Sequence, residues 1–338
     1  MRKIHFLFTS CFLLTICTLF WGFSKQVTNS LSADSTVSEA LVFLGGTLPD
    51  HARPEADSAT IRRGFELVHQ GRTIGPDGKR SKYISKYYFC TSCHNQVQED
   101  PVLFEMNPET RLEYAAKNDL KFLPASTFLG IANRESWYND DYYKKYGDLV
   151  KPANKSLAEA TQLCAKVCSS GRYLEEWELE AILAYYWDIQ LKLGDLGLTK
   201  QEWAQLNSSQ NKQDARALLK SKYALRSPAT FGDVPADKSK GFSYSGDPKK
   251  GEKIYSLSCM ACHQEGGVSD VSFDYSKLTF QKFLRNLDHT DAYNLYEICR
   301  YGTYADKGKP RYMPLYPKER MSDKQLEDLR AYIEQEAS

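Results

Sequence analysis

Two short stretches of the chain place two cysteines and a histidine at one fixed spacing. Residues 90–94 read CTSCH and residues 259–263 read CMACH, so both match the pattern C-x-x-C-H. In this pattern two thiols can add across the two vinyl groups of a haem, while the adjacent imidazole binds the iron. The sequence therefore predicts two covalently attached haem c groups. The expected cofactor-binding residues are Cys90, Cys93, His94, Cys259, Cys262 and His263.

Three other kinds of site use paired cysteines at this spacing. A thioredoxin-like redox site would need a strand–helix–strand setting, and the pattern around these motifs does not predict one. Structural zinc would need four soft ligands grouped in one place, and a structural disulfide is the third alternative. Two copies of the pattern, each with its histidine, favour haem over these alternatives.

A haem with one histidine needs a second axial ligand or an open site, and this choice sets its redox potential. For the second motif, Met313 lies after the cysteines and shortly before the last expected helix, where a loop can fold over the ring. His289 is the rival ligand, and a purely apolar role is the other alternative for Met313. Ligation by the thioether would raise the potential of this haem.

The first half of the chain offers cysteines instead of a well-placed methionine. Met106 follows His94 too closely to reach across a haem ring, whereas Cys164 and Cys168 precede the closing helix of this half. We predict that a thiolate binds the first iron, with Cys164 preferred over Cys168 as the metal ligand. A disulfide between the two is the alternative, although the i,i+4 spacing on a helix would strain it. Cys299, at the matching place in the second half, is expected to be a buried thiol.

Helices must position these residues in each half of the chain. Asp247 can cap a helix before the second motif, and Ser322 with Gln325 forms a capping box that opens the last helix. The first half repeats this plan with apolar stripes in residues 61–68 and 177–186. Asp57 or Ser58 can cap the earlier of these two helices. We expect the first and last helices of each half to cross.

A length of 338 residues accommodates two such units. The expected fold is all-α, with two cytochrome c-like (class I) haem domains in tandem. The expected segments are 1–26 as a signal peptide or N-terminal membrane anchor, 27–56 as a linker, 57–192 as an elaborated first cytochrome c domain, 193–246 as a linker with short helices, and 247–338 as the second cytochrome c domain. Within the second linker, we expect short helices from 199 and over 213–223, then an extended segment, 227–245, over the domain junction.

The N-terminus has the layout of an export signal. Residues 4–23 are apolar without a charged side chain, and Arg2 and Lys3 precede them. The positive-inside bias places the rest of the chain outside the cytoplasm. Because no small-x-small site follows, both a cleaved leader and an uncleaved anchor stay open, with lipidation at Cys17 as a minor alternative. We expect a periplasmic protein that is soluble or tethered to the inner membrane through residues 4–23.

The charge balance limits the kinds of partner. The chain has 44 Lys and Arg against 43 Asp and Glu, which gives a formal net charge of +1. Such a balance creates no global field that would attract nucleic acid. We therefore expect no nucleic-acid partner, and local recognition of a redox partner protein.

The sequence resembles the periplasmic dihaem thiosulfate dehydrogenases and the related haem subunit of the bacterial sulfur-oxidising complex. The resemblance covers residues 57–338 and depends on RRGFELV at 62–68, the two C-x-x-C-H motifs, Leu163-Cys164, Gly171 and Met313-Pro314. In those enzymes the first haem has histidine and cysteine ligands and is the substrate site, while the second passes electrons on. The resemblance implies Cys164 as the catalytic residue and these metal ligands: His94, Cys164, His263 and Met313.

The residues after Cys164 depart from that family. The family carries an aromatic residue, an arginine and a Ser-Met-Asn-Gly run there, of which only Gly171 remains in this chain. Lys166 and Arg172 can attract either a thiosulfate-like anion or a haem propionate. The identity of any substrate therefore stays open.

The expected function is electron transfer between the two haems. A thiolate ligand lowers the potential of the first iron and a thioether raises that of the second, so electrons would run from the first to the second. Two one-electron centres also fit oxidation of thiosulfate or a similar sulfur anion, which would make the protein an oxidoreductase of the thiosulfate dehydrogenase type. The alternatives are a non-enzymatic periplasmic electron carrier, a haem subunit of a membrane respiratory complex, and a peroxidase-like dihaem enzyme.

Overall fold

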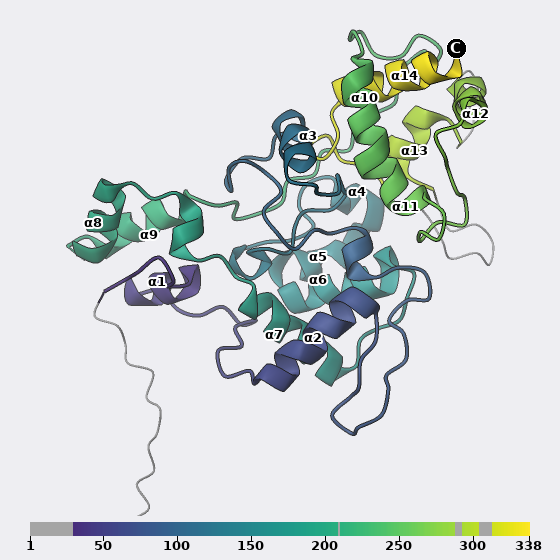
Figure 1. The fold of residues 1–338 in the computed structure, drawn as a ribbon. Helices are drawn as coiled ribbons and strands as arrows, with labels where there is room; N and C mark the ends of the chain where they lie inside the picture. The colour runs from purple at the N-terminus through teal and green to yellow at the C-terminus, as the bar shows by residue number, and fades with distance from the viewer. Residues whose placement is uncertain (1–29, 209, 288–292, 304–312) are drawn as a thin grey trace, which may run out of the picture.

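The computed structural model describes residues 30–208, 210–287, 293–303 and 313–338 (Figure 1). The predicted leader and the rival ligand His289 lie outside these ranges. Within the described residues the chain is helical, and its only β-type pairings are two isolated bridges. This confirms the all-α prediction. None of the helices in the described ranges has the length and apolar character that a membrane span requires.

The helices fall into an earlier, a middle and a later group along the chain. The earlier group contains α1 (Val37–Phe43), α2 (Ser58–Gln70), α3 (Pro108–Lys117), α4 (Tyr142–Tyr146), α5 (Val150–Lys155), α6 (Leu157–Leu163) and α7 (Glu176–Asp188). The middle and later groups contain α8 (Lys200–Ser208), α9 (Lys212–Lys220), α10 (Pro248–Ile254), α11 (Met260–His263), α12 (Lys277–Leu287), α13 (Leu295–Tyr301) and α14 (Asp323–Ala337). Short 3-10 turns lie at Cys90–Ser92, Ile131–Asn133, Gly147–Leu149 and Leu193–Leu196, and π-helical segments at Cys164–Cys168 and Tyr255–Cys259.

In the first half, α2 packs closely against α7. Asp57 caps α2 by accepting a hydrogen bond from the Thr60 amide at 2.6 Å. The two helices meet at Gly64, where an added Cβ would lie 1.9 Å from the Ala181 carbonyl oxygen. Only a residue without a Cβ allows the two backbones to approach this closely.

In the second half, α10 crosses α14 in the same way. Ser322 and Gln325 form the predicted capping box at the start of α14. At the crossing, a Cβ on Gly251 would lie 2.0 Å from the Asp328 carbonyl oxygen. The prediction that the first and last helices of each half cross is therefore confirmed.

Each half has its own apolar core, but the boundary between them differs from the sequence prediction. Leu112 and Ala115 of α3, together with Phe122, belong to the core of the second half rather than the first. Figure 1 accordingly shows α3 beside α10. The segment that contains α3 thus reaches across the domain junction, because its apolar face packs against the later helices.

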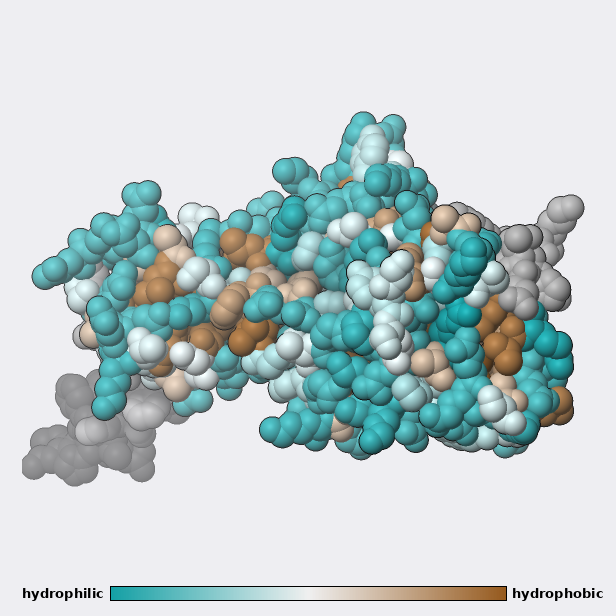
Figure 2. All heavy atoms as spheres, turned by 90° about the horizontal axis from the view of Figure 1, so that it is seen from above, coloured by the Kyte–Doolittle hydropathy of each residue, from teal (hydrophilic) through white to brown (hydrophobic). Residues whose placement is uncertain are grey.

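The predicted linkers are more ordered than expected. Apolar residues of α1, α8 and α9 share a third cluster, which includes Leu44, Leu206 and Leu219. The two short helices predicted for the second linker are present as α8 and α9. These elements form a lobe beside the main body (Figure 1), and apolar side chains also reach its surface (Figure 2). Residues that lie far apart in sequence, at 31–44 and 191–225, therefore make one small packing unit.

The segment after Ser227 crosses the junction between the halves, as predicted. The Phe231 amide donates to Asp141 in the first half at 2.8 Å, and the Thr230 amide donates to Glu319 in the second half at 2.8 Å. Backbone donors of one extended segment therefore tie both halves together.

Candidate functional site

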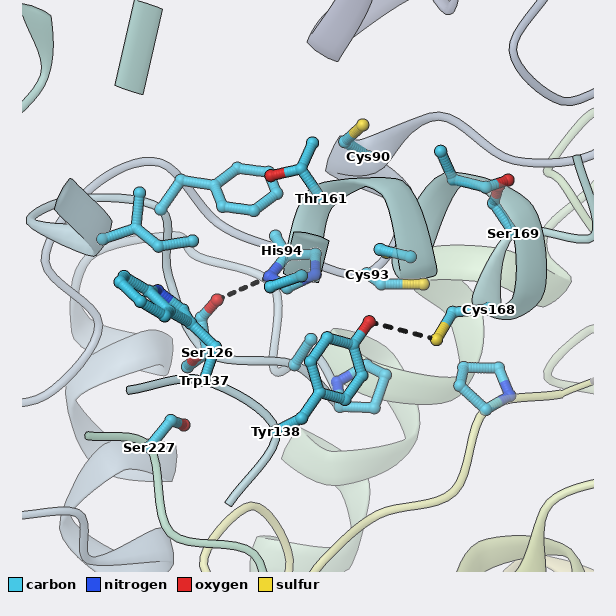
Figure 3. Close-up of a pocket in the computed structure, with 18 of the residues that line it drawn as sticks. Cys90, Cys93, His94, Ser126, Trp137, Tyr138, Thr161, Cys168, Ser169 and Ser227 are labelled. Carbon is cyan, nitrogen blue, oxygen red and sulfur yellow. Dashed lines mark hydrogen bonds between the residues drawn. The ribbon is translucent and has the colours of Figure 1, made fainter. Parts of the chain in front are cut away.

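The first C-x-x-C-H motif lines a large cavity at the junction of the two halves. Its open space is about 1540 Å³ when the mouth toward solvent is counted. Cys90, Cys93 and His94 lie on its wall together with mainly apolar and aromatic side chains (Figure 3). Residues of the second half, including Pro314 and Arg320, complete the wall.

His94 is held in the tautomer that a metal ligand needs. Its Nδ1 lies 2.6 Å from the Ser126 carbonyl oxygen. Because a carbonyl only accepts, Nδ1 carries the proton and Nε2 keeps its lone pair. The ring stacks on Phe128 at 4.1 Å between centroids. Burial lowers the pKa of His94 to about 4, so the imidazole is neutral at physiological pH.

His263 has the same surroundings in the second half. Its Nδ1 lies 2.8 Å from the Val271 carbonyl oxygen, and its ring stacks on Phe273 at 4.1 Å. In both halves the accepting carbonyl comes two residues before the stacking aromatic. Sequence reasoning missed these partners because they follow the histidine at different distances: 32 residues in the first half and 8 in the second.

These observations test whether the first cavity suits a haem. A c-type haem needs two thiols on one side, a neutral histidine with a free nitrogen, and apolar walls that exclude water. Cys90, Cys93 and His94 meet the first two needs, and Phe128, Ile182 and Tyr186 contribute to the third. The residues present therefore fit the group.

Cys164 and Cys168 line the same cavity from a π-helical segment at the end of α6. Neither takes part in a disulfide in this structure. The Cys168 sulfur lies 3.3 Å from the Tyr138 hydroxyl and 3.4 Å from the Tyr146 hydroxyl (Figure 3). The structure thus brings both cysteines to the wall of the cavity that holds Cys90, Cys93 and His94.

Two cations singled out in the sequence do not reach the cavity. Both terminal nitrogens of Arg172 donate to the buried Glu178 at 2.6 Å. Lys166 instead lies near the Tyr173 ring, with 5.7 Å between its Nζ and the ring centroid. The cations that line the cavity are Arg134, Lys145 and Arg320, which no local motif indicated.

The second site is only partly described. Met313 is half-buried and packs against the core that also contacts Cys259. Its backbone pairs with Thr303, whose hydroxyl accepts from the Met313 amide at 2.7 Å. Cys299 is 4% exposed, and burial raises the pKa of its thiol to about 11, in agreement with the predicted buried thiol.

Comparison with protein families identifies the second half. Residues 248–336 match the family described as Cytochrome c. This stretch is a cytochrome c domain. It runs from the first residue of α10 to the last turn of α14 and contains the second C-x-x-C-H motif. A domain of this family binds haem c covalently and transfers electrons, and we assign this property to residues 248–336. No curated protein and no solved structure matches the chain.

The cytochrome c domain contacts the first motif directly. The Cys262 thiol lies 3.9 Å from the Ser92 carbonyl oxygen, so the two C-x-x-C-H motifs are neighbours. Beside them, Arg320 of the cytochrome c domain forms a two-pronged ion pair with Glu99 at 2.7 and 2.9 Å. Burial alone would raise the pKa of Glu99, but Arg320 and other hydrogen-bond donors lower it to about 2. Glu99 is therefore ionised at neutral pH.

Asp100, next to this pair, should give the stability of the protein an unusual pH dependence. Burial raises its pKa to about 6, and its buried Oδ1 accepts no hydrogen bond from the described residues. The unfolded carboxyl loses its proton near pH 4, whereas the folded one keeps it up to about pH 6. The raised pKa of Asp100 therefore makes its full contribution to the free energy of unfolding below about pH 4. That contribution is lost as the pH rises to about 6.

Asp100→Asn should remove this pH-dependent loss and raise the free energy of unfolding at pH 7 by about 3 kcal/mol. Denaturant unfolding at pH 4.5 and pH 7 measures the effect. Identical pH profiles for the variant and the original protein across this range would contradict the prediction.

Proposed function

We propose that the chain holds two haem c groups, one in each half, and passes electrons from the first to the second. The first half repeats two features of the cytochrome c domain: the close helix crossing at a glycine, and the histidine with a carbonyl on Nδ1 and a stacked aromatic. These parallels support a tandem of two cytochrome c-like domains. The two halves differ in the number of residues between the histidine and its carbonyl partner, which is 32 in the first half and 8 in the second.

The chain's own residues would set the direction of transfer. Haem iron gains or loses one electron at a time. His94 and His263 present neutral Nε2 atoms, and we propose Cys164 and Met313 as the opposing ligands. Thiolate ligation stabilises the oxidised iron and lowers the potential, while a thioether raises it. Cys164 is preferred over Cys168 because the Cys168 sulfur is already engaged by two tyrosine hydroxyls.

The contact between the two motifs carries this proposal. Ser92 and Cys262 belong to the two C-x-x-C-H motifs themselves, and their atoms approach within 3.9 Å. Groups bonded to these motifs would lie close enough for direct exchange without a mediating protein. The buried pair of Glu99 and Arg320 also joins the first half to the cytochrome c domain.

The cavity also suits oxidation of a small sulfur anion such as thiosulfate. Lys145 is half-buried on its wall, where partial loss of water strengthens attraction of an anion. Two one-electron centres match a two-electron oxidation. A non-enzymatic electron carrier, or a haem subunit of a membrane respiratory complex, is the alternative. In each case we propose a periplasmic location, with a redox partner protein and with residues 4–23 as leader or tether.

Haem stoichiometry tests the central part of the proposal. We expect two covalent haems per chain in the original protein. The double variants Cys90→Ser/Cys93→Ser and Cys259→Ser/Cys262→Ser should each retain one. Intact mass and haem absorbance per polypeptide measure the number, with Cys299→Ser as a control that keeps both. A single haem in the original protein, lost only with Cys259 and Cys262, would refute the two-haem proposal and leave one cytochrome c domain.

A further inference from the structure

The π-helical turn at Cys164–Cys168 changes how these two cysteines relate to each other. An α-helix has 3.6 residues per turn, so residues four apart lie on the same face but are offset around the axis. A π-helix closes its hydrogen bonds from i to i+5 and has more residues per turn. Residues four apart stay on the same face, and the smaller rise per residue brings them closer together along the helix axis. The argument that i,i+4 spacing strains a disulfide therefore does not apply to this segment.

The side chains follow this geometry. The thiol of Cys168 hydrogen-bonds to that of Cys164, and this contact is the largest influence that raises the pKa of Cys164. Both thiols lie on the wall of one cavity, and neither is in a disulfide in this structure. The next turn of chain is also fixed, because Ser169 donates its amide to the Cys164 carbonyl at 2.9 Å.

Tyrosines hold one of the two sulfurs in place. Tyr138 and Tyr146 contact the Cys168 sulfur from the opposite wall at 3.3 and 3.4 Å. Tyr138 adopts a left-handed backbone with φ of 49°, which is uncommon for a residue with a side chain. Its position is therefore set by tertiary packing rather than by local preference. The Cys168 sulfur consequently has a defined direction toward both the cavity and Cys164.

We propose that Cys164 and Cys168 are a redox-active dithiol that closes to a disulfide. In the reaction, one cysteine attacks a small-molecule or protein disulfide and releases one thiol from it. The second cysteine then displaces the remaining half of the oxidant. One S–S bond forms in the chain and one breaks in the oxidant, which takes up the two electrons and the two protons. Closure removes both thiols from the cavity wall, so the redox state of the pair decides whether a thiolate is present there.

The sequence between the two cysteines makes the disulfide directly measurable. Trypsin cleaves after Lys155, Lys166 and Arg172, which places each cysteine in its own peptide, 156–166 or 167–172. The haem-loaded protein is equilibrated with oxidised or reduced glutathione, quenched in acid, alkylated under denaturing conditions and digested. We expect the two peptides to be joined after oxidation, with a mass 2 Da below their sum, and to be separate and alkylated after reduction.

Variants distinguish this pair from other thiols. Cys164→Ser and Cys168→Ser should each abolish the joined peptide, while Cys299→Ser should keep it. Recovery of both peptides as separate alkylated species at every glutathione ratio would overturn the proposal. So would mixed disulfides with glutathione on each cysteine without a joined pair. Haem content and absorbance of the same samples report on the proposed function independently, since the peptide masses do not depend on which ligand the iron has.

Discussion

Replacing Arg320 with Met should lower the free energy of unfolding by about 3–5 kcal/mol, because it leaves the Glu99 carboxylate buried without its cation. Both side chains of this pair are 3% exposed, so water cannot replace the lost partner. Arg320 also donates to the Leu123 and Ala125 carbonyls, which would lose a donor as well. Denaturant unfolding of the haem-loaded protein at pH 7 measures the change.

Two matched variants separate burial from charge. Arg62→Ala removes an i,i+4 ion pair with Glu66 in which the Arg62 side chain is 80% exposed. This change should lower the free energy of unfolding by less than about 0.5 kcal/mol. Arg320→Met combined with Glu99→Met should recover part of the lost stability, because no isolated charge remains. A loss below about 1 kcal/mol for Arg320→Met alone would show that this pair does not hold the two halves together.

Cys164→Ala should raise the potential of the first haem by on the order of 100 mV or more, since axial ligands set haem potentials over a range of about 0.8 V. The physical reason is the loss of a charged donor that stabilises oxidised iron. We also expect the absorption features of low-spin histidine and thiolate ligation to disappear. An optical redox titration measures the potential and the absorption features. It uses protein in which Cys164 and Cys168 are both reduced thiols.

Cys168→Ala is the matched control for the ligand assignment. It removes the neighbouring sulfur, together with its contacts to Tyr138 and Tyr146, but keeps Cys164. We expect its potential to stay closer to that of the original protein than the potential of Cys164→Ala does. If Cys168→Ala alone shifts the spectrum, Cys168 is the ligand. If neither variant does, no thiolate binds the first iron, and the analogy with the sulfur-oxidising enzymes fails.

Arg320→Met and Cys164→Ala probe different parts of one arrangement. The pair of Arg320 and Glu99 joins the two halves, whose C-x-x-C-H motifs are in contact, whereas Cys164 would set the potential difference that drives transfer between the proposed haems. A protein that loses the ion pair should therefore keep its first-haem spectrum while its stability falls. Cys164→Ala should instead change the first-haem spectrum while the stability stays nearly the same.

Much of the local structure could be predicted from the sequence alone. The C-x-x-C-H spacing determines the kind of covalent chemistry, because the motif lies within five consecutive residues. The capping box at Ser322 and Gln325 and the apolar stripes determine the helices for the same reason, since capping and amphipathic periodicity act within a few turns. The all-α fold and the crossing of the first and last helices in each half followed from these local signals, whereas the structure placed the crossing points at Gly64 and Gly251.

Tertiary packing decided what those signals could not express. Several contacts join residues whose separation in the chain follows no fixed period. They are the hydrogen bonds from His94 and His263 to backbone carbonyls, the contact between Ser92 and Cys262, and the ion pair of Arg172 with Glu178. Likewise, α3 joined the core of the other half, and the predicted linkers built a third apolar cluster. The sequence by itself determined which groups are available and which helices form. Only the fold decided which groups meet, because that depends on which apolar faces bury one another across long stretches of chain.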